Sequence, residues 1–86
     1  MKLLQLPKGM VSLEFPPSER DDLMRRLALL GSVKRQRHAS HEKVSVGAVQ
    51  FIHEDEWDEP CLISTSVAGA DLLRELVSKQ ARSKAA

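Results

Sequence analysis

The chain has 86 residues, of which 42% are hydrophobic and 29% charged, and its net charge is +1. This length and balance indicate one small globular domain, and they argue against a disordered chain, which would be poorer in apolar residues. The three aromatic residues, Phe15, Phe51 and Trp57, are too few for a surface that stacks several nucleic-acid bases.

The single cysteine and the apolar runs bear on the compartment. Cys61 cannot form an internal disulfide, which favours a reducing compartment. The opening Met1-Lys2-Leu3-Leu4 resembles the start of a signal peptide, but the apolar run ends at Gln5 and is too short for a hydrophobic signal region. No stretch approaches the roughly 20 apolar residues of a membrane span. We therefore expect a cytoplasmic protein without a membrane contact.

The small net charge hides a segregation along the chain. Residues 1–43 carry nine Lys and Arg against five Asp and Glu, whereas residues 44–86 carry four against seven. Surfaces of opposite sign can steer a partner, or they can meet each other in a self-association interface. A homodimer whose acidic and basic segments pair across a two-fold axis is therefore one open alternative.

The first third of the chain predicts a hairpin and a helix. Two short strands at residues 3–6 and 10–15 flank a Pro-Lys-Gly turn, and the second strand alternates apolar and polar residues. Ser18 is a candidate N-cap for a helix over residues 18–30, whose apolar positions recur at helical spacing, and Gly31 follows as its C-terminal signal. The basic residues 34–43 lack any period, so we expect a loop of roughly ten residues there.

The second half predicts another hairpin and another helix. In residues 44–51 the apolar residues occupy even positions up to Ala48 and odd positions from Val49 on. This change beside Gly47 suggests a β-bulge or a strand buried on both faces. The acidic block 53–60 is expected to form the loop of this hairpin, and Pro60 opens a return strand over residues 61–67. Ser66 or Asp71 is expected to cap the second helix.

These elements combine into a small α+β fold of order ββαββα. We expect one antiparallel sheet with two helices packed on one face. The domain is predicted to cover residues 1–79, and residues 80–86 are predicted to form a basic, flexible C-terminal tail.

The acidic block is the leading candidate for a binding site. Its carboxylates repel one another and gain nothing inside a core, and a tryptophan stands among them. Tryptophan is strongly enriched in interface hot spots, and flanking carboxylates would steer a basic partner toward it. A solvated loop whose tryptophan folds back onto the sheet is the alternative. The predicted partner-binding residues are Glu54, Asp55, Glu56, Trp57, Asp58 and Glu59.

The basic segment before this block supports an alternative function. Its cations could contact phosphates of a nucleic acid, although so few contacts would give weak and strongly salt-dependent binding. They could also remain solvated or pair with the acidic block. The candidate residues are Lys34, Arg35, Arg37 and Lys43.

Metal binding and catalysis find little support in the sequence. His38, His41, His53 and Cys61 have the right ligand types for zinc, but their spacing matches no familiar structural site. Cys61 with His53 could be written as a nucleophile and base, yet no third residue is placed to orient the histidine. The glycines form no phosphate-binding motif. We therefore expect no metal, no cofactor and no enzyme activity.

The function that the sequence favours is non-enzymatic protein binding. Its size, uneven charge and lack of catalytic motifs are typical of small accessory, regulatory or inhibitory proteins of bacteria and phages, which is an analogy of size and composition only. We expect the partner to be another protein with a basic surface, bound through the acidic block. Nucleic-acid binding through residues 34–43 is the alternative.

Overall fold

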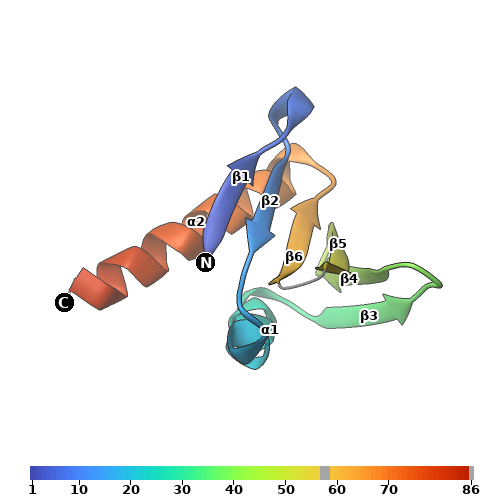
Figure 1. Ribbon diagram of the computed structural model, residues 1–86, viewed down its shortest axis with the longest axis horizontal. Helices are drawn as coiled ribbons and strands as arrows, with labels where there is room; N and C mark the ends of the chain where they lie inside the picture. Colours follow the sequence, from blue (N-terminus) through green and yellow to red (C-terminus); the bar gives the residue numbers. More distant parts are fainter. Residues whose placement is uncertain (57–58, 86) are drawn as a thin grey trace.

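The computed structural model describes residues 1–56 and 59–85, and the side chains of residues 1–55 and 59–79. Within these residues it shows one small α+β domain, in which two helices cover a six-stranded antiparallel sheet (Figure 1). The predicted fold class is therefore confirmed. The elements are β1 (Lys2–Gln5), β2 (Val11–Glu14), α1 (Arg20–Leu30), β3 (Val33–Arg37), β4 (Glu42–Val46), β5 (Val49–Glu56), β6 (Glu59–Ser64) and α2 (Val67–Ala85), with short 3₁₀ helices η1 (Pro7–Gly9) and η2 (Pro17–Glu19).

The strands lie in the order β1-β2-β6-β5-β4-β3, and every neighbouring pair is antiparallel. Successive side chains of a strand point to opposite faces of the sheet. One face, called the inner face below, carries fully buried residues such as Leu13, Leu62 and Phe51, which pack against α1 and α2 in one apolar cluster. The opposite, outer face carries no helix within the described residues, as Figure 1 also shows.

The first hairpin forms as predicted. β1 and β2 pair with Leu3 opposite Leu13, and the Pro-Lys-Gly segment forms η1 between them. Lys8 and Gly9 both have positive φ angles, of 64° and 78°. The α-helix that follows ends at Leu30 as predicted but begins only at Arg20, after η2. The prediction that Ser18 caps it is wrong, because the N-cap position is occupied by Glu19 and has no side-chain hydrogen bond.

The prediction of a loop over residues 34–43 is wrong. β3 and β4 form a hairpin there, with only residues 38–41 between them. β3 is an edge strand whose side chains are almost all exposed, so it lacks the apolar alternation that would have revealed it. Charged side chains on an edge strand are a common protection against unwanted strand pairing.

The apolar phase flip beside Gly47 marks a tight turn and not a bulge. Val46 and Val49 stand opposite each other in the β4–β5 ladder, and only Gly47 and Ala48 lie between them. Gly47 has a φ angle of +60°, and a glycine with positive φ at the first central position is characteristic of a type II′ hairpin turn. The two apolar phases therefore belong to two strands.

The predicted loop over residues 53–60 is also wrong in extent. β5 continues to Glu56, β6 resumes at Glu59, and these two residues pair across the ladder. Pairing of the backbone does not require apolar side chains, and acidic residues remain hydrated on the outer face or at the end of the strands. Trp57 and Asp58 lie outside the described residues.

The last helix, α2, begins at Val67. The hydroxyl of Ser66 accepts a hydrogen bond from the amide of Gly69 at 3.1 Å, so Ser66 and not Asp71 provides the cap. The helical backbone continues to Ala85, past residue 80, where the sequence analysis places the start of the tail. The flexibility of that segment stays a prediction. No helix in the described part of the chain is long and apolar enough to cross a bilayer.

Candidate functional site

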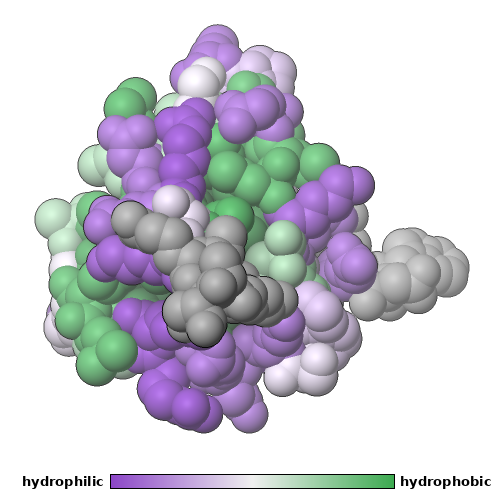
Figure 2. Space-filling view, turned by 90° about the vertical axis from the view of Figure 1, so that its left-hand side faces the viewer, coloured by the Kyte–Doolittle hydropathy of each residue, from purple (hydrophilic) through white to green (hydrophobic). Residues whose placement is uncertain are grey.

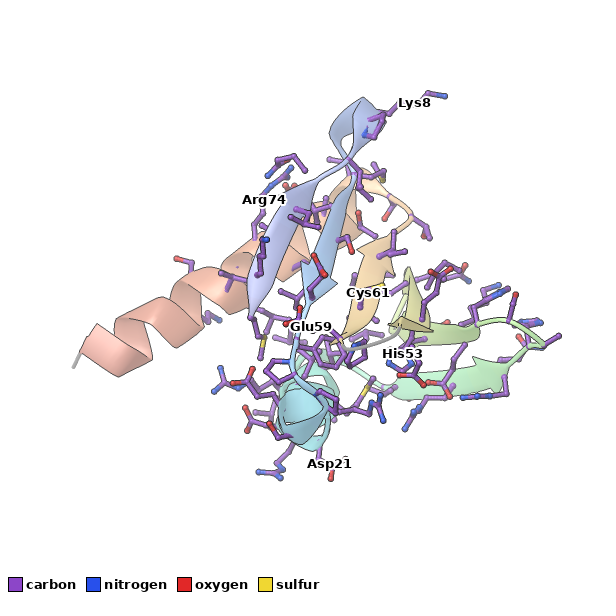
Figure 3. All side chains as sticks on the ribbon, viewed as in Figure 1. Lys8, Asp21, His53, Glu59, Cys61 and Arg74 are labelled. Carbon is purple, nitrogen blue, oxygen red and sulfur yellow. The ribbon has the colours of Figure 1, made fainter. Side chains whose placement is uncertain are left out.

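Part of the predicted acidic site gathers on the outer face of the sheet. Cys61 lies between Glu14 on β2 and Glu54 on β5 in the strand register, and Glu59 precedes it by two residues on the same face. We call Glu14, Glu54 and Glu59 the acidic patch. Glu59 and Cys61 are labelled in Figure 3. Glu14 was not among the predicted site residues, because only the pairing of β2 with β6 brings it there.

Within the described part of the chain the acidic patch has no ion-paired carboxylate, although Lys2 stands opposite Glu14 in the β1–β2 ladder. No ion pair or side-chain hydrogen bond found there involves any of its three carboxylates, although other exposed acids of the chain pair with neighbouring arginine or lysine side chains. An apolar hollow of about 260 Å³ adjoins the patch. It is lined by Leu4, Leu6, Ser12, Glu14, Cys61 and Ile63. Negative charge and partly buried apolar side chains thus lie together on a helix-free surface.

Asp55 does not join this patch. It is one residue along β5 from Glu54 and therefore points to the other side of the sheet, where it forms an ion pair with Arg20 of α1. The predicted set is thus divided between the two faces. Glu56 is described only in its backbone, opposite Glu59, while Trp57 and Asp58 lie outside the described residues. Their predicted role in binding stays a prediction.

A partly buried ionic cluster that the sequence analysis missed lies on the inner face. The guanidinium of Arg35 donates two hydrogen bonds to Oε1 of Glu42, at 3.0 and 2.8 Å. Nδ1 of His53 lies 3.4 Å from the same oxygen. The His53 ring stacks on Phe15 with 6.1 Å between the ring centroids. Glu42 stands directly opposite His53 in the β4–β5 ladder, so only a correct strand register could have revealed the pair.

The surroundings of His53 favour its neutral form. Burial lowers the pKa of its imidazole from the ordinary value of 6.5, and the nearby carboxylates of Asp55 and Glu42 offset that effect only in part. Arg20 and Arg35 lower the pKa further. Within the described residues Nε2 has no hydrogen-bond partner, and it lies 3.9 Å from Asp55.

The chemistry that this cluster can perform is limited by its burial. His53 is only 3% exposed, so a large substrate has no access to its ring. A hollow of about 160 Å³ beside it is lined by cationic, anionic and neutral polar groups together, among them Arg37, His41 and Asp55. This mixture selects no one class of ligand. The cluster therefore fits an internal network that fixes β3, β4 and α1 against β5.

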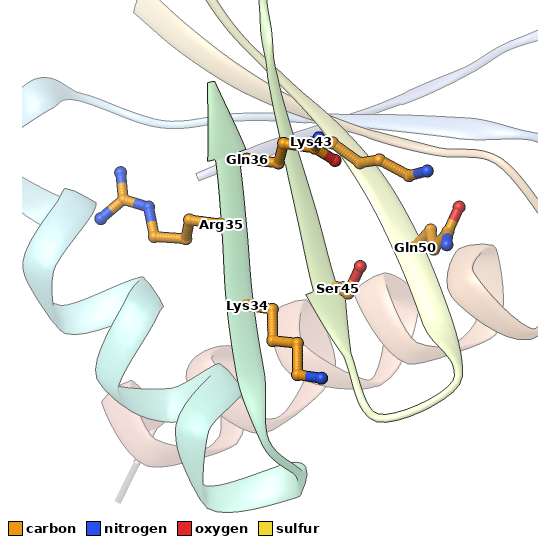
Figure 4. A pocket seen from close by; sticks show the side chains of 6 residues that line it. All are labelled: Lys34, Arg35, Gln36, Lys43, Ser45 and Gln50. Carbon is orange, nitrogen blue, oxygen red and sulfur yellow. The ribbon is translucent and has the colours of Figure 1, made fainter. Parts of the chain in front are cut away.

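The four predicted basic residues are also divided between the two faces of the sheet. Lys34 and Lys43 lie on the outer face, where they line a polar hollow of about 370 Å³ with Gln36, Ser45 and Gln50 (Figure 4). Arg35 also borders this hollow, but its guanidinium turns away from it toward Glu42. Arg37 shares the inner-face parity of Arg35 in β3. Two of the four predicted cations thus remain together on the outer face.

The candidate metal and nucleophile sets are not brought together. Cys61 and His53 point to opposite faces of the sheet, so they do not form the nucleophile and base considered from the sequence. His38 and His41 stack on each other at 4.8 Å in the β3–β4 turn. Among the described side chains, no three His, Cys, Asp or Glu residues have an arrangement that could hold a metal ion.

Comparison with known proteins adds no further constraint, since no family model, curated protein or solved structure matches this chain significantly.

Proposed function

We propose that this protein is a non-enzymatic binding module that recognises a basic surface of another protein through the acidic patch. The observation that carries the proposal is that three carboxylates, Glu14, Glu54 and Glu59, share one face without an ion pair among the described residues. A partner with a cationic surface could meet all three carboxylates at once.

The apolar hollow beside the patch supports the same function. Leu4, Leu6 and Ile63 are only partly buried, so a partner could cover them while its cations meet the carboxylates. Interfaces commonly combine an apolar centre with a charged rim that sets orientation and association rate. The predicted anchor, Trp57, comes directly after β5 in the sequence, and its role in binding stays a prediction.

The proposal is tested by affinity capture from a cell extract followed by mass spectrometry. We expect the wild type to retain proteins with basic surfaces, and we expect the Glu54→Lys/Glu59→Lys variant to lose them. Asp21→Lys/Asp71→Lys is the matched control, since it makes the same charge change at exposed positions on the two helices. Retention that is equal for both variants would contradict the proposal. Trp57→Ala is expected to weaken a captured complex by about 2 kcal/mol or more without unfolding the domain.

Nucleic-acid binding is the second candidate, and the hollow lined by Lys34 and Lys43 favours it. Amide and hydroxyl groups beside two ammonium groups suit a phosphate backbone. The test is fluorescence anisotropy with a labelled single-stranded oligonucleotide at low and high salt. We expect binding that weakens steeply with salt and that falls in a Lys34→Glu/Lys43→Glu variant. Absence of binding at low salt would remove this candidate.

A further inference from the structure

The most exposed large apolar side chains of the described chain are not on the acidic surface. Leu29, Leu30 and Val67 are 84%, 50% and 64% exposed, and the first two form the last turn of α1. Leu29 and Leu30, together with Leu76 of α2, line a groove of about 370 Å³ between the helices. Leu76 itself belongs to the buried core, so the groove leads from the surface down to the apolar cluster.

The groove is a gap in the layer that α1 and α2 form on the inner face. α2 contacts β1, β2, β5 and β6, whereas α1 contacts β4, so the two helices meet the sheet over different strands. The C-terminal part of α2 projects past the sheet (Figure 1). The side of the molecule where α2 ends shows apolar surface between hydrophilic side chains (Figure 2). A partner helix laid between α1 and α2 would continue the layer and bury the exposed leucines.

The charged residues of the groove indicate which charge a partner should carry. Its described lining contains two cations, Arg26 and Lys79, and no acidic residue. Each cation pairs with an acid one turn earlier on its own helix, Arg26 with Asp22 at 2.9 Å and Lys79 with Glu75 at 3.3 Å. The first pair is partly buried and the second is exposed, and pairs one turn apart on a helix contribute little, so both cations can exchange them for a partner's carboxylates.

We propose that the groove between α1 and α2 binds an acidic amphipathic helix of another protein, with Leu29, Leu30 and Leu76 as the apolar floor and Arg26 and Lys79 as the charged rim. A second copy of the chain fits less well. A two-fold contact through this groove would bring the rim cations of both copies together. This surface is separate from the acidic patch, and the charged residues that line it are cations.

The test uses a labelled peptide of about 15 residues, roughly four helical turns, with leucines at positions i, i+3, i+4 and i+7 flanked by glutamates. Its matched counterpart carries lysines in place of the glutamates. We expect saturable binding of the glutamate peptide by fluorescence anisotropy, weaker by at least about tenfold in Leu29→Gln. Val67→Gln is the control, because it removes an exposed apolar side chain outside the groove. The Arg26→Glu/Lys79→Glu variant should instead prefer the lysine peptide.

Several results would overturn this proposal. Equal binding of the two peptides, equal effects of Leu29→Gln and Val67→Gln, or no saturable binding would each do so. So would self-association in analytical ultracentrifugation that Leu29→Gln abolishes, or sedimentation with anionic vesicles in place of peptide binding. The Glu54→Lys/Glu59→Lys variant should bind the glutamate peptide as the wild type does. The outcome is therefore independent of the proposed function of the acidic patch.

Discussion

Two regions of the inner face of the sheet are packed with different kinds of side chain, one apolar and one ionic. Beneath α2, Leu13 and Leu62 of the sheet are fully buried with Leu73 of the helix among apolar neighbours. Toward the other end of β4 and β5, near the start of α1, Glu42, His53 and their arginine partners take the place of aliphatic side chains. The aliphatic part depends on shape and volume, whereas the ionic part depends on pairing and on pH. The same six strands thus carry two kinds of packing with different sensitivities.

The largest expected effect lies in the aliphatic part. Leu62→Ala should lower the free energy of unfolding by about 2–5 kcal/mol, because it removes a fully buried side chain and leaves a cavity. Urea denaturation followed by circular dichroism measures the change. Ile63→Ala, one residue along the same strand and only partly buried on the outer face, should cost clearly less. Equal losses would show that the outer face is packed as closely as the inner one.

A smaller loss is expected in the ionic part. Glu42→Gln removes the charge that binds Arg35 and lies beside His53, and hydrogen bonds to charged groups contribute about 1.5–3 kcal/mol. The Arg35 side chain is 47% exposed, so solvent screening places the expected loss at the lower end of that range. Glu75→Gln, in an exposed pair on α2, should change stability by no more than about 0.5 kcal/mol. If Glu42→Gln lowers the free energy of unfolding by no more than Glu75→Gln does, the cluster adds nothing to the stability of the fold.

The two parts should also differ in their response to pH. The pKa of His53 is lower in the folded protein than its ordinary value of 6.5, so the neutral ring is favoured by the fold. The stability that depends on it is present above pH 6.5 and is lost as pH falls through the folded pKa. Urea denaturation between pH 7.5 and 5 should show this loss, and His53→Gln should reduce it. An unchanged pH dependence in His53→Gln would assign the loss to other groups.

The difference between the two parts also explains what could be predicted from the sequence. Alternating apolar residues in 10–15 and the helical spacing of Leu23 and Leu27 gave the hairpin, the first helix and the fold class correctly. The ionic part leaves no such pattern, because Arg35, Glu42 and His53 satisfy one another across strands instead of following an apolar period. The sequence therefore predicts a loop over residues 34–43, which covers most of β3 but only the first two residues of β4. The acidic patch could not be predicted in full, because Glu14 joins it only through the pairing of β2 with β6. No local sequence pattern indicates that pairing.

A still smaller effect on stability than that of Glu42→Gln is expected at the border between the two parts, where Asp55 pairs with Arg20. Both side chains are partly exposed, and pairs of this kind contribute about 0–1 kcal/mol, so Asp55→Asn should change the free energy of unfolding by less than about 1 kcal/mol. The same variant sharpens the functional assignment. Asp55 faces away from the acidic patch, so Asp55→Asn should leave partner capture unchanged, whereas Glu54→Gln, the same change on the adjacent residue, should reduce it. Reduced capture in both variants would return Asp55 to the binding surface that the sequence predicts.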